Sequence, residues 1–343
     1  MNKMKKALFI GGTGTISLSI VRRLVTLGWD VWTLNRGSRR DVLPEEVHQL
    51  IADAYDENET AKAIEGLHFD TVCEFIAYTV ADVERDIRLF SPITDQYIFI
   101  SSASAYQKPP VSPYITEATP LVNPYWEYSR NKQACEERLF REYQLNGFPV
   151  TVVRPSHTYD DRNIPVAIHG KNGSWQIVKR MREGKKVLVP GDGKTLWTLT
   201  WCEDFAVGFT GLMGKKEAIG EAFQITGDES LTWDQILSLV AEATGGVYRP
   251  CHVPSDLLGN VGRKYGYDYT GELLGDKANT VIFRNDKLKM LVPEMETRVL
   301  FSEGVKKCAE RILSDPSLQK EDPVFDDFSD RVVSAMEKLE TMI

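Results

Sequence analysis

The sequence has few cysteines, no long apolar run and no surplus of positive charge, and each shortage excludes a class of protein. The five cysteines among 343 residues share no short spacing, so neither a disulfide framework nor a metal site is expected, as in a reducing cytosol. No segment approaches the roughly 20 apolar residues of a membrane span. The apolar run at residues 7–10 is too short for the core of a secretory signal. We therefore expect a cytoplasmic protein without membrane contact.

The charge of the chain argues against a nucleic-acid partner. Aspartate and glutamate outnumber lysine and arginine by 49 to 41, and the formal net charge of −8 repels a phosphate backbone. The only dense basic stretch is NRGSRR, residues 35–40. We expect a small-molecule substrate and no nucleic acid.

Strand-like and helix-like stretches alternate over the first 160 residues. Six short apolar runs are separated by amphipathic stretches such as residues 15–28 and 128–147. This alternation predicts an α/β fold with a doubly wound parallel sheet and crossover helices on both faces. After residue 163 the rhythm loosens, but no linker separates the two parts. We expect two interleaved units, one of residues 1–163 and about 198–228 and a smaller α/β unit of about 164–197 and 229–343.

A glycine-rich turn joins the first strand to the first helix. Residues 9–17 read FIGGTGTIS, and Ser17 stands where a third glycine is usual. Glycine suits this turn because the backbone must approach a pyrophosphate bound at the helix N-terminus. The turn therefore predicts a dinucleotide site in a Rossmann domain, the larger of the two units, whereas a tight turn without a ligand is the alternative. The expected contacts from the turn are Gly11, Thr13, Gly14, Thr15 and Ile16.

The end of the second strand bears on which nucleotide binds. An acidic residue there would bind the ribose 2′-hydroxyl, but the chain has Asn35 and Arg36, followed by Arg39 and Arg40. Neutral and cationic side chains suit a 2′-phosphate, which favours NADP(H), with NAD(H) as the alternative cofactor. A solvated basic turn is the alternative interpretation of the arginines.

Five motifs in order resemble the extended short-chain dehydrogenase/reductase family, of the NAD-dependent epimerase/dehydratase type, over most of the chain. They are IGGTGTIS (10–17), IADAYD (51–56), FISSASAY (99–106), YSRNK (128–132) and VVRPSHTY (152–159). The resemblance implies that the larger unit binds the dinucleotide and the smaller one binds the substrate. It also implies that Asp53 contacts the adenine, that Ile76 and Ala77 lie beneath the cofactor, and that Pro155 contacts the nicotinamide end. By analogy with the family, a homodimer is one expected assembly.

The resemblance further implies a catalytic set of Tyr128, Lys132 and Ser102. Tyrosine is a poor base at neutral pH, but Lys132 lies one helical turn away on the same face. Its charge, with that of an oxidised nicotinamide, favours the phenolate, and in the family this lysine also binds the nicotinamide ribose. Ser102 would hydrogen-bond the substrate oxygen.

Three activities remain open at this point. The first is an epimerase or dehydratase that transfers a hydride at a carbinol or ketone carbon, with Tyr128 as the acid/base. The second is a net NADPH-dependent ketone reductase. The third is a non-catalytic RNA-binding relative such as the chloroplast stem-loop binding proteins, which the glycine turn also resembles.

Four further residues are candidates for the substrate pocket: Ser104, Tyr106, His157 and Trp197. Ser104 could instead cap the fifth strand, and His157 could be a satisfied loop histidine. Sugar-nucleotide members of the family carry a diphosphate-binding arginine at about the position of Trp197, and a histidine where Trp201 stands. The tryptophans suit ring stacking and core packing equally. The missing cation predicts a sugar-like or small hydroxy or keto substrate without a nucleotide diphosphate. The alternative is that Lys194, or Lys171, Lys179 or Arg180 in the preceding segment, supplies the charge.

Overall fold

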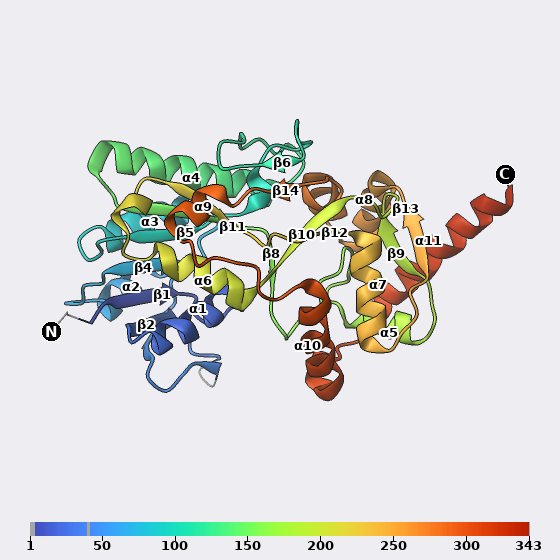
Figure 1. Ribbon diagram of the computed structural model, residues 1–343, viewed down its shortest axis with the longest axis horizontal. Coiled ribbons are helices and arrows are strands. Elements are labelled where there is room, and N and C mark those ends of the chain that lie inside the picture. Colours follow the sequence, from blue (N-terminus) through green and yellow to red (C-terminus); the bar gives the residue numbers. More distant parts are fainter. Residues whose placement is uncertain (1–3, 40–41, 343) are drawn as a thin grey trace.

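The computed structural model describes residues 4–39 and 42–342, and a seven-stranded parallel sheet dominates the larger part (Figure 1). The strands occur in the order β11–β7–β5–β4–β1–β2–β3 across the sheet. In chain order they are β1 (Lys6–Ile10), β2 (Asp30–Asn35), β3 (His48–Ile51), β4 (Thr71–Glu74), β5 (Tyr97–Ile100), β7 (Val150–Pro155) and β11 (Ala222–Ile225). The predicted doubly wound Rossmann sheet is confirmed.

Two layers of helices cover the faces of this sheet. Helices α1 (Thr15–Thr26) and α6 (Cys202–Leu212) pack together over one face, and α2 (Glu57–Ala63), α3 (Val80–Phe90) and α4 (Glu127–Asn146) cover the other. Strand β1 explains why both faces need cover, because Phe9 faces one apolar cluster and Leu8 faces the other. Alternation along a strand buried on both sides produces this pattern.

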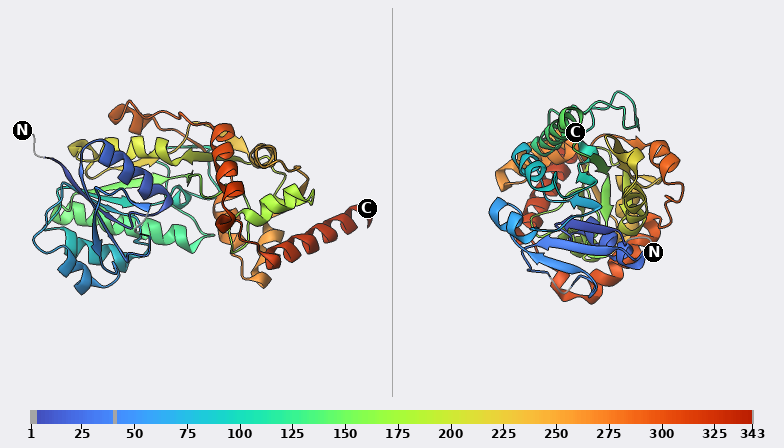
Figure 2. Two further views of the ribbon diagram at one scale, coloured as in Figure 1. Left: turned by 90° about the horizontal axis from the view of Figure 1, so that it is seen from below. Right: turned by 90° about the vertical axis from the view of Figure 1, so that its left-hand side faces the viewer.

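The smaller part has three short sheets around a third apolar cluster. They are β12 (Ser230–Thr232), β10 (Leu196–Trp201) and β8 (His157–Tyr159); β13 (Pro250–Val253) and β9 (Val187–Pro190); and β14 (Ile282–Phe283) and β6 (Tyr114–Ile115). The helical elements are α5 (Trp175–Arg182), α7 (Trp233–Thr244), α8 (Ser255–Gly262), the π-helical η5 (Thr270–Lys277), α10 (Phe301–Ser314) and α11 (Pro323–Met342). Helix α11 extends away from the rest of the molecule (Figure 2).

The chain passes directly from the large sheet to a small one at a single residue. Pro155 ends β7 and His157 begins β8, with Ser156 between them. Strand β8 pairs with β10, so the carboxyl edge of the large sheet adjoins the smaller part at this point. Ligands in open α/β sheets bind at this edge.

Three details differ from the sequence-based expectations. Strand β5 ends at Ile100, and the next residues form a short 3₁₀ turn, η2 (Ala103–Ala105), instead of continuing the strand. Strand β10, which was expected in the larger unit from about residue 198 onward, joins the three-stranded sheet of the smaller part. Helix α9 (Asp286–Leu291), expected in the smaller unit, packs on α6 and β11, because Leu288 and the following Val292 complete the apolar cluster beside α6.

No helix in the described part of the chain is long and apolar enough to cross a bilayer. The same residues contain no group of three histidine, cysteine, aspartate or glutamate side chains arranged to hold a metal ion.

Candidate active site

Three adjoining hollows follow the carboxyl edge of the large sheet. Gly11 and Ile76 line both the first and the second hollow, and Ser102, Tyr128 and His157 line both the second and the third. We call the first two the groove and the third the cavity. All but two of the predicted site residues line them. In the groove these are Gly11, Thr13, Gly14, Thr15, Ile16, Asn35, Arg36, Asp53, Ile76 and Lys132; in the cavity Ser104 and Trp197; and at the junction Ser102, Tyr128, Pro155 and His157.

The two exceptions are Ala77 and Tyr106. Ala77 is fully buried behind the groove, where its carbonyl accepts a hydrogen bond from Lys132. The Tyr106 hydroxyl donates to Gln224 at 3.0 Å and accepts from Arg154 at 3.3 Å inside the core. Tyr106 therefore supports the wall and does not face the cavity.

The glycine turn is shaped to bring backbone close to a ligand. Gly11 has φ of +83°, and a Cβ there would lie 2.6 Å from the Ile76 side chain. Ser17 replaces the third glycine without opening the turn, since its hydroxyl donates to the Gly11 carbonyl at 2.8 Å and accepts from the Gly14 amide at 2.9 Å. The first amides of α1 lack intrahelical partners, and no acidic residue lies in its first turn. This geometry suits a pyrophosphate.

A cation stands beside the same helix end and was not predicted. The Arg162 guanidinium approaches the Thr15 hydroxyl at 3.4 Å while it pairs with Asp160. No motif identified Arg162, because it lies 147 residues from Thr15 in the chain.

Asn35 is held within its own turn at the outer end of the groove. Its side-chain oxygen accepts from the Gly37 amide at 2.9 Å and its amide donates to Thr33 at 3.2 Å. Arg36 and Arg39 line the same hollow, and no described carboxylate pairs with either of them. Arg40 lies outside the described residues.

Lys132 is buried and joins two strand ends. Its ammonium donates to the Ala77 carbonyl at 2.8 Å and to the Ile100 carbonyl at 2.7 Å. Burial lowers its pKa to about 8. An ammonium has three donors, so one N–H remains for the groove that Lys132 lines.

Tyr128 lies at the junction of groove and cavity as a neutral phenol. Burial raises its pKa to about 12, although the adjacent Ser102 hydroxyl opposes the shift. The Lys132 ammonium donates to the Ala77 and Ile100 carbonyls and lies 6.0 Å from the Tyr128 ring centre. A neutral phenol is a proton donor at pH 7.

Three serine hydroxyls form a chain that ends at the junction. Ser129 donates to Ser104 at 2.8 Å, and the Ser104 and Ser102 hydroxyls are 2.9 Å apart. The Ser102 oxygen also accepts from the Ser104 amide at 3.1 Å. With Ser104 donating onward, the Ser102 proton is left for a substrate oxygen. Ser129 directly follows Tyr128 in the chain, but its role depends on a contact that the sequence does not reveal.

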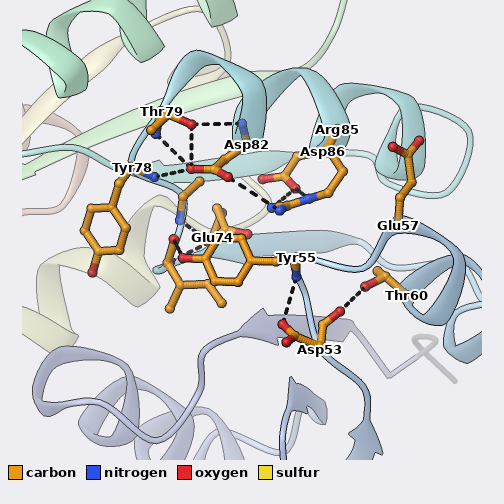
Figure 3. A network of polar contacts seen from close by, with 12 residues as sticks. Asp53, Tyr55, Glu57, Thr60, Glu74, Tyr78, Thr79, Asp82, Arg85 and Asp86 are labelled. Carbon is orange, nitrogen blue, oxygen red and sulfur yellow. Dashed lines mark hydrogen bonds and ion pairs between the residues drawn. The ribbon is translucent and has the colours of Figure 1, made fainter.

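A buried polar network holds the segment beneath the groove (Figure 3). One oxygen of Glu74, at the end of β4, accepts from the Ile76 and Ala77 amides at 2.5 and 2.8 Å. The other oxygen has no partner among the described residues. Burial and the neighbouring Asp86 carboxylate raise the pKa of Glu74 well above its ordinary value. Tyr55 adds a bond to the Ile76 carbonyl at 2.7 Å.

The cavity measures about 250 Å³ and combines aromatic walls with few polar groups. Trp126 and Phe283 line it beside the predicted Trp197, and Asp276 supplies a carboxylate. Trp197 is only 4% exposed and stacks on Trp233 at 5.6 Å, so most of it is core. Burial lowers the pKa of His157 to about 3, which keeps this histidine neutral.

Trp201 lies outside the cavity, where it packs against Tyr159 with ring centres 5.2 Å apart. Neither Trp126 nor Asp276 was predicted as a site residue. Trp126 precedes Tyr128 by two residues, which was an available signal. Asp276 lies 148 residues from Tyr128, and no motif marks it.

Comparison with known proteins identifies the family of the chain. The model of the NAD dependent epimerase/dehydratase family matches residues 7–226, which confirms the resemblance seen in the motifs. Chloroplast stem-loop binding protein of 41 kDa b from Arabidopsis thaliana is 30% identical over 257 residues, covering 70% of this chain and 64% of that protein. The match thus spans slightly less than two thirds of that relative.

Two further proteins illustrate the range of the similarity. The 2′-dehydrokanamycin reductase of Streptomyces kanamyceticus is 23% identical over 254 residues, covering 73% of this chain and 70% of the reductase. The UDP-glucuronic acid 4-epimerase of Bacillus cereus, solved with UDP-glucuronic acid and NAD, superposes with a TM-score of 0.72 at 17% identity. It covers 90% of this chain and 99% of the epimerase, and shows the shared fold.

Gly11→Ala is expected to weaken NADH and NADPH binding at least about tenfold. The new Cβ meets Ile76, which must move into the groove. Gly28→Ala is the matched control, because Gly28 has φ of +75° but nothing lies within 4 Å of its Cβ position. Both variants incur backbone strain of roughly 1–2 kcal/mol. Fluorescence titration of the two variants separates the effects, and equal affinities would contradict the assigned role of Gly11.

Glu74→Gln is expected to stabilise the protein increasingly as pH rises. The raised pKa means that the stability contributed by Glu74 is complete at acidic pH and is lost as pH rises through the folded-state pKa. Glutamine keeps the oxygen that accepts from Ile76 and Ala77 and never ionises. Urea denaturation at about pH 5 and about pH 8 should show a gap that widens at the higher pH.

Asp82→Asn is the contrasting control for this experiment. Burial raises the pKa of Asp82, but hydrogen bonds from the Tyr78 and Thr79 groups outweigh burial and leave it below the ordinary value. Removing that charge should lower the free energy of unfolding at about pH 8. The loss should become smaller as pH falls from the ordinary pKa of an aspartate through the lowered pKa of Asp82. The same sign for both variants would contradict the raised pKa of Glu74.

Proposed function

The chain belongs to the NAD-dependent epimerase/dehydratase family, and on that premise we propose that it transfers a hydride at a carbinol or ketone carbon, with Tyr128 as the acid/base. The observation that carries the proposal is that Tyr128 lines both the groove and the cavity. A bound nicotinamide supplies or accepts the hydride. The glycine turn, the free amides of α1 and the remaining N–H of Lys132 are the groups that would hold it.

Tyr128 and Ser102 act on the oxygen of the reacting carbon. In the reducing direction the neutral phenol of Tyr128 donates a proton to the carbonyl oxygen as negative charge develops there. The Ser102 proton, freed by the serine chain, hydrogen-bonds the same oxygen. The raised pKa of Tyr128 keeps the phenol protonated for this donation, and the relative named a 2′-dehydrokanamycin reductase supports a net ketone reductase as the alternative to an epimerase or dehydratase.

The substrate is a small hydroxy or keto compound without a nucleotide diphosphate. No lysine or arginine belongs to the described lining of the cavity, and burying a diphosphate without a cation is costly. The volume of about 250 Å³ is also below the range of about 300–1,000 Å³ typical of drug-sized ligands. A single ring therefore fits better than a nucleotide sugar.

An RNA-binding role is the second candidate, because the Arabidopsis relative is named a stem-loop binding protein. The net charge of −8 and the assembled Tyr128, Ser102 and Lys132 support catalysis instead. A gel-shift titration with structured RNA at physiological salt distinguishes the two roles. Tight RNA binding combined with no turnover of any carbonyl or hydroxy compound would favour this second candidate.

Tyr128→Phe is expected to lower turnover about 10²–10⁴-fold, the usual contribution of general acid–base catalysis. The phenylalanine ring still packs against Trp126, so folding and cofactor affinity should change little. Tyr125→Phe is the matched control, since Tyr125 lies on the exposed side of the same region and lines neither groove nor cavity. If Tyr128→Phe kept more than roughly a tenth of the turnover rate of the unmodified protein, Tyr128 would not be the residue that transfers the proton.

NADPH is expected to bind more tightly than NADH because Arg36 faces the outer end of the groove without a described carboxylate partner. A charge-assisted pair with the 2′-phosphate contributes about 10–150-fold in affinity. Arg36→Gln should abolish this preference and leave NADH binding nearly unchanged. Arg331→Gln, which removes the same charge from α11, should keep it. Equal affinities of the unmodified protein for NADPH and NADH would show that Arg36 does not contact the 2′-phosphate and belongs to a solvated turn.

A further inference from the structure

Asp276 supplies the only carboxylate in the described lining of the cavity, and its backbone is fixed on both sides. The Asn123 amide donates to the Gly275 carbonyl at 2.7 Å, and the Trp233 indole donates to the Lys277 carbonyl at 3.0 Å. Asn123 also donates to the Ser104 carbonyl at 2.7 Å. One buried amide therefore sets the position of Asp276 relative to the serine turn. The π-helical geometry of η5, which carries Asp276, is frequent at functional sites.

A buried lysine that does not line the cavity balances the charge of Asp276. The Lys108 ammonium lies 3.7 Å from its carboxylate, and the Lys108 side chain is 1% exposed whereas that of Asp276 is 18% exposed. Lys277, the next cation, pairs with Glu272 at 3.0 Å. No hydrogen bond of 3.5 Å or less reaches the Asp276 carboxylate from another described residue. A carboxylate can accept about four hydrogen bonds, so its acceptors remain available on the cavity side.

An aromatic wall stands next to this carboxylate. Trp126 lines the cavity and packs directly on η5, because Gly271 and Gly275 have no side chains. A Cβ at Gly271 would lie 2.3 Å from the Trp126 ring. Phe283 belongs to the same lining. The cavity thus offers a hydrogen-bond acceptor beside aromatic surface, the combination that suits the hydroxyl groups and the apolar face of one ring.

We infer that Asp276 is a specificity-determining residue that accepts hydrogen bonds from the hydroxyl groups of an uncharged ring substrate lying against Trp126. The inference rests on the proposed function, because the ring is the substrate that carries the reacting carbinol or ketone carbon, for which Tyr128 is the acid/base. Lys108 already balances the carboxylate, so an ammonium group gains less from Asp276 than it would from an unpaired carboxylate. A nucleotide diphosphate would meet this carboxylate with like charge.

The titration of Asp276 provides a signature. Burial raises its pKa to about 6, although Lys108 and Lys277 oppose the shift; Glu272 adds to it. Below about pH 6 the protonated carboxyl accepts more weakly, so KM for the ring substrate should rise as pH falls through this value. His157 in the same lining has a pKa of about 3, and Tyr128 titrates far above this range, so neither accounts for such a change.

The test compares the unmodified protein with Asp276→Asn and with Glu272→Gln as the matched control. Glu272 lies on the same η5 segment but does not line the cavity. Methyl glucoside, myo-inositol, cyclohexanol, cyclohexanone, glucosamine and UDP-glucose are offered with each nicotinamide cofactor. Turnover is followed by nicotinamide absorbance, and binding to the cofactor-bound protein by calorimetry.

The expected result has three parts. Methyl glucoside or myo-inositol binds the unmodified protein more tightly than cyclohexanol. Asp276→Asn weakens that binding, or raises KM, about tenfold or more, with a smaller change in kcat. Its KM also loses the rise at acidic pH, whereas Glu272→Gln retains the rise but at a lower pH, because Glu272 adds to the raised pKa of Asp276.

Several outcomes would overturn the inference. They are unchanged KM and pH profile in Asp276→Asn, tighter binding of glucosamine or UDP-glucose than of the uncharged rings, and no binding of any ring by the unmodified protein. Ring binding that depends on Asp276 but never leads to turnover would instead overturn the proposed function and leave the inference standing. Turnover by Asp276→Asn with unmodified KM would overturn the inference and leave the proposed function standing.

Discussion

The site depends on one buried ammonium group. Lys132 reaches from α4 to the carbonyl of Ala77, just past the end of β4, and to that of Ile100, the last residue of β5. A buried cation is costly unless its donors are satisfied, so these carbonyls must stay where they are. The same helix carries Tyr128 one turn earlier. Fixing Lys132 therefore also fixes where the phenol lies relative to both strand ends.

The substrate side is tied to this arrangement through backbone carbonyls. Asn123 connects the serine turn to η5, and the passage from Pro155 to His157 connects the large sheet to β8. The wall of the cavity thus combines residues from both parts of the molecule. Its shape depends on contacts between segments that lie more than a hundred residues apart.

The sequence predicted the parts of the site that depend on local geometry. The glycine turn, the long helix with Tyr128 and Lys132 one turn apart, and the alternating order of the sheet all follow from short patterns. Ser102 was predicted to act with Tyr128, and both line the junction. The contact of Ser102 with Ser104 was not predicted, since β5 ends at Ile100 and a 3₁₀ turn brings the two hydroxyls together. A strand pattern does not show where the strand stops.

Residues whose role depends on distant contacts could not be predicted in this way. Asp276 and Arg162 lie on irregular segments, and only the fold brings each of them to the site. Tyr106 was a candidate for the substrate pocket, but the turn directs its hydroxyl to Gln224 in the core. No sequence pattern singled out Glu74, whose raised pKa follows from its burial and from Asp86, twelve positions later.

Burial sets the ionisation of the groups around the junction in one consistent direction. It raises the pKa of Tyr128 and Asp276 and lowers the pKa of Lys132 and His157. Each shift favours the uncharged form of its group. The phenol and the imidazole are neutral at pH 7, and the one carboxylate in the cavity is balanced by Lys108. A site with so little net charge gains little from an ionic ligand. It can discriminate by the number and position of hydroxyl groups, because a buried acceptor left without a donor is penalised.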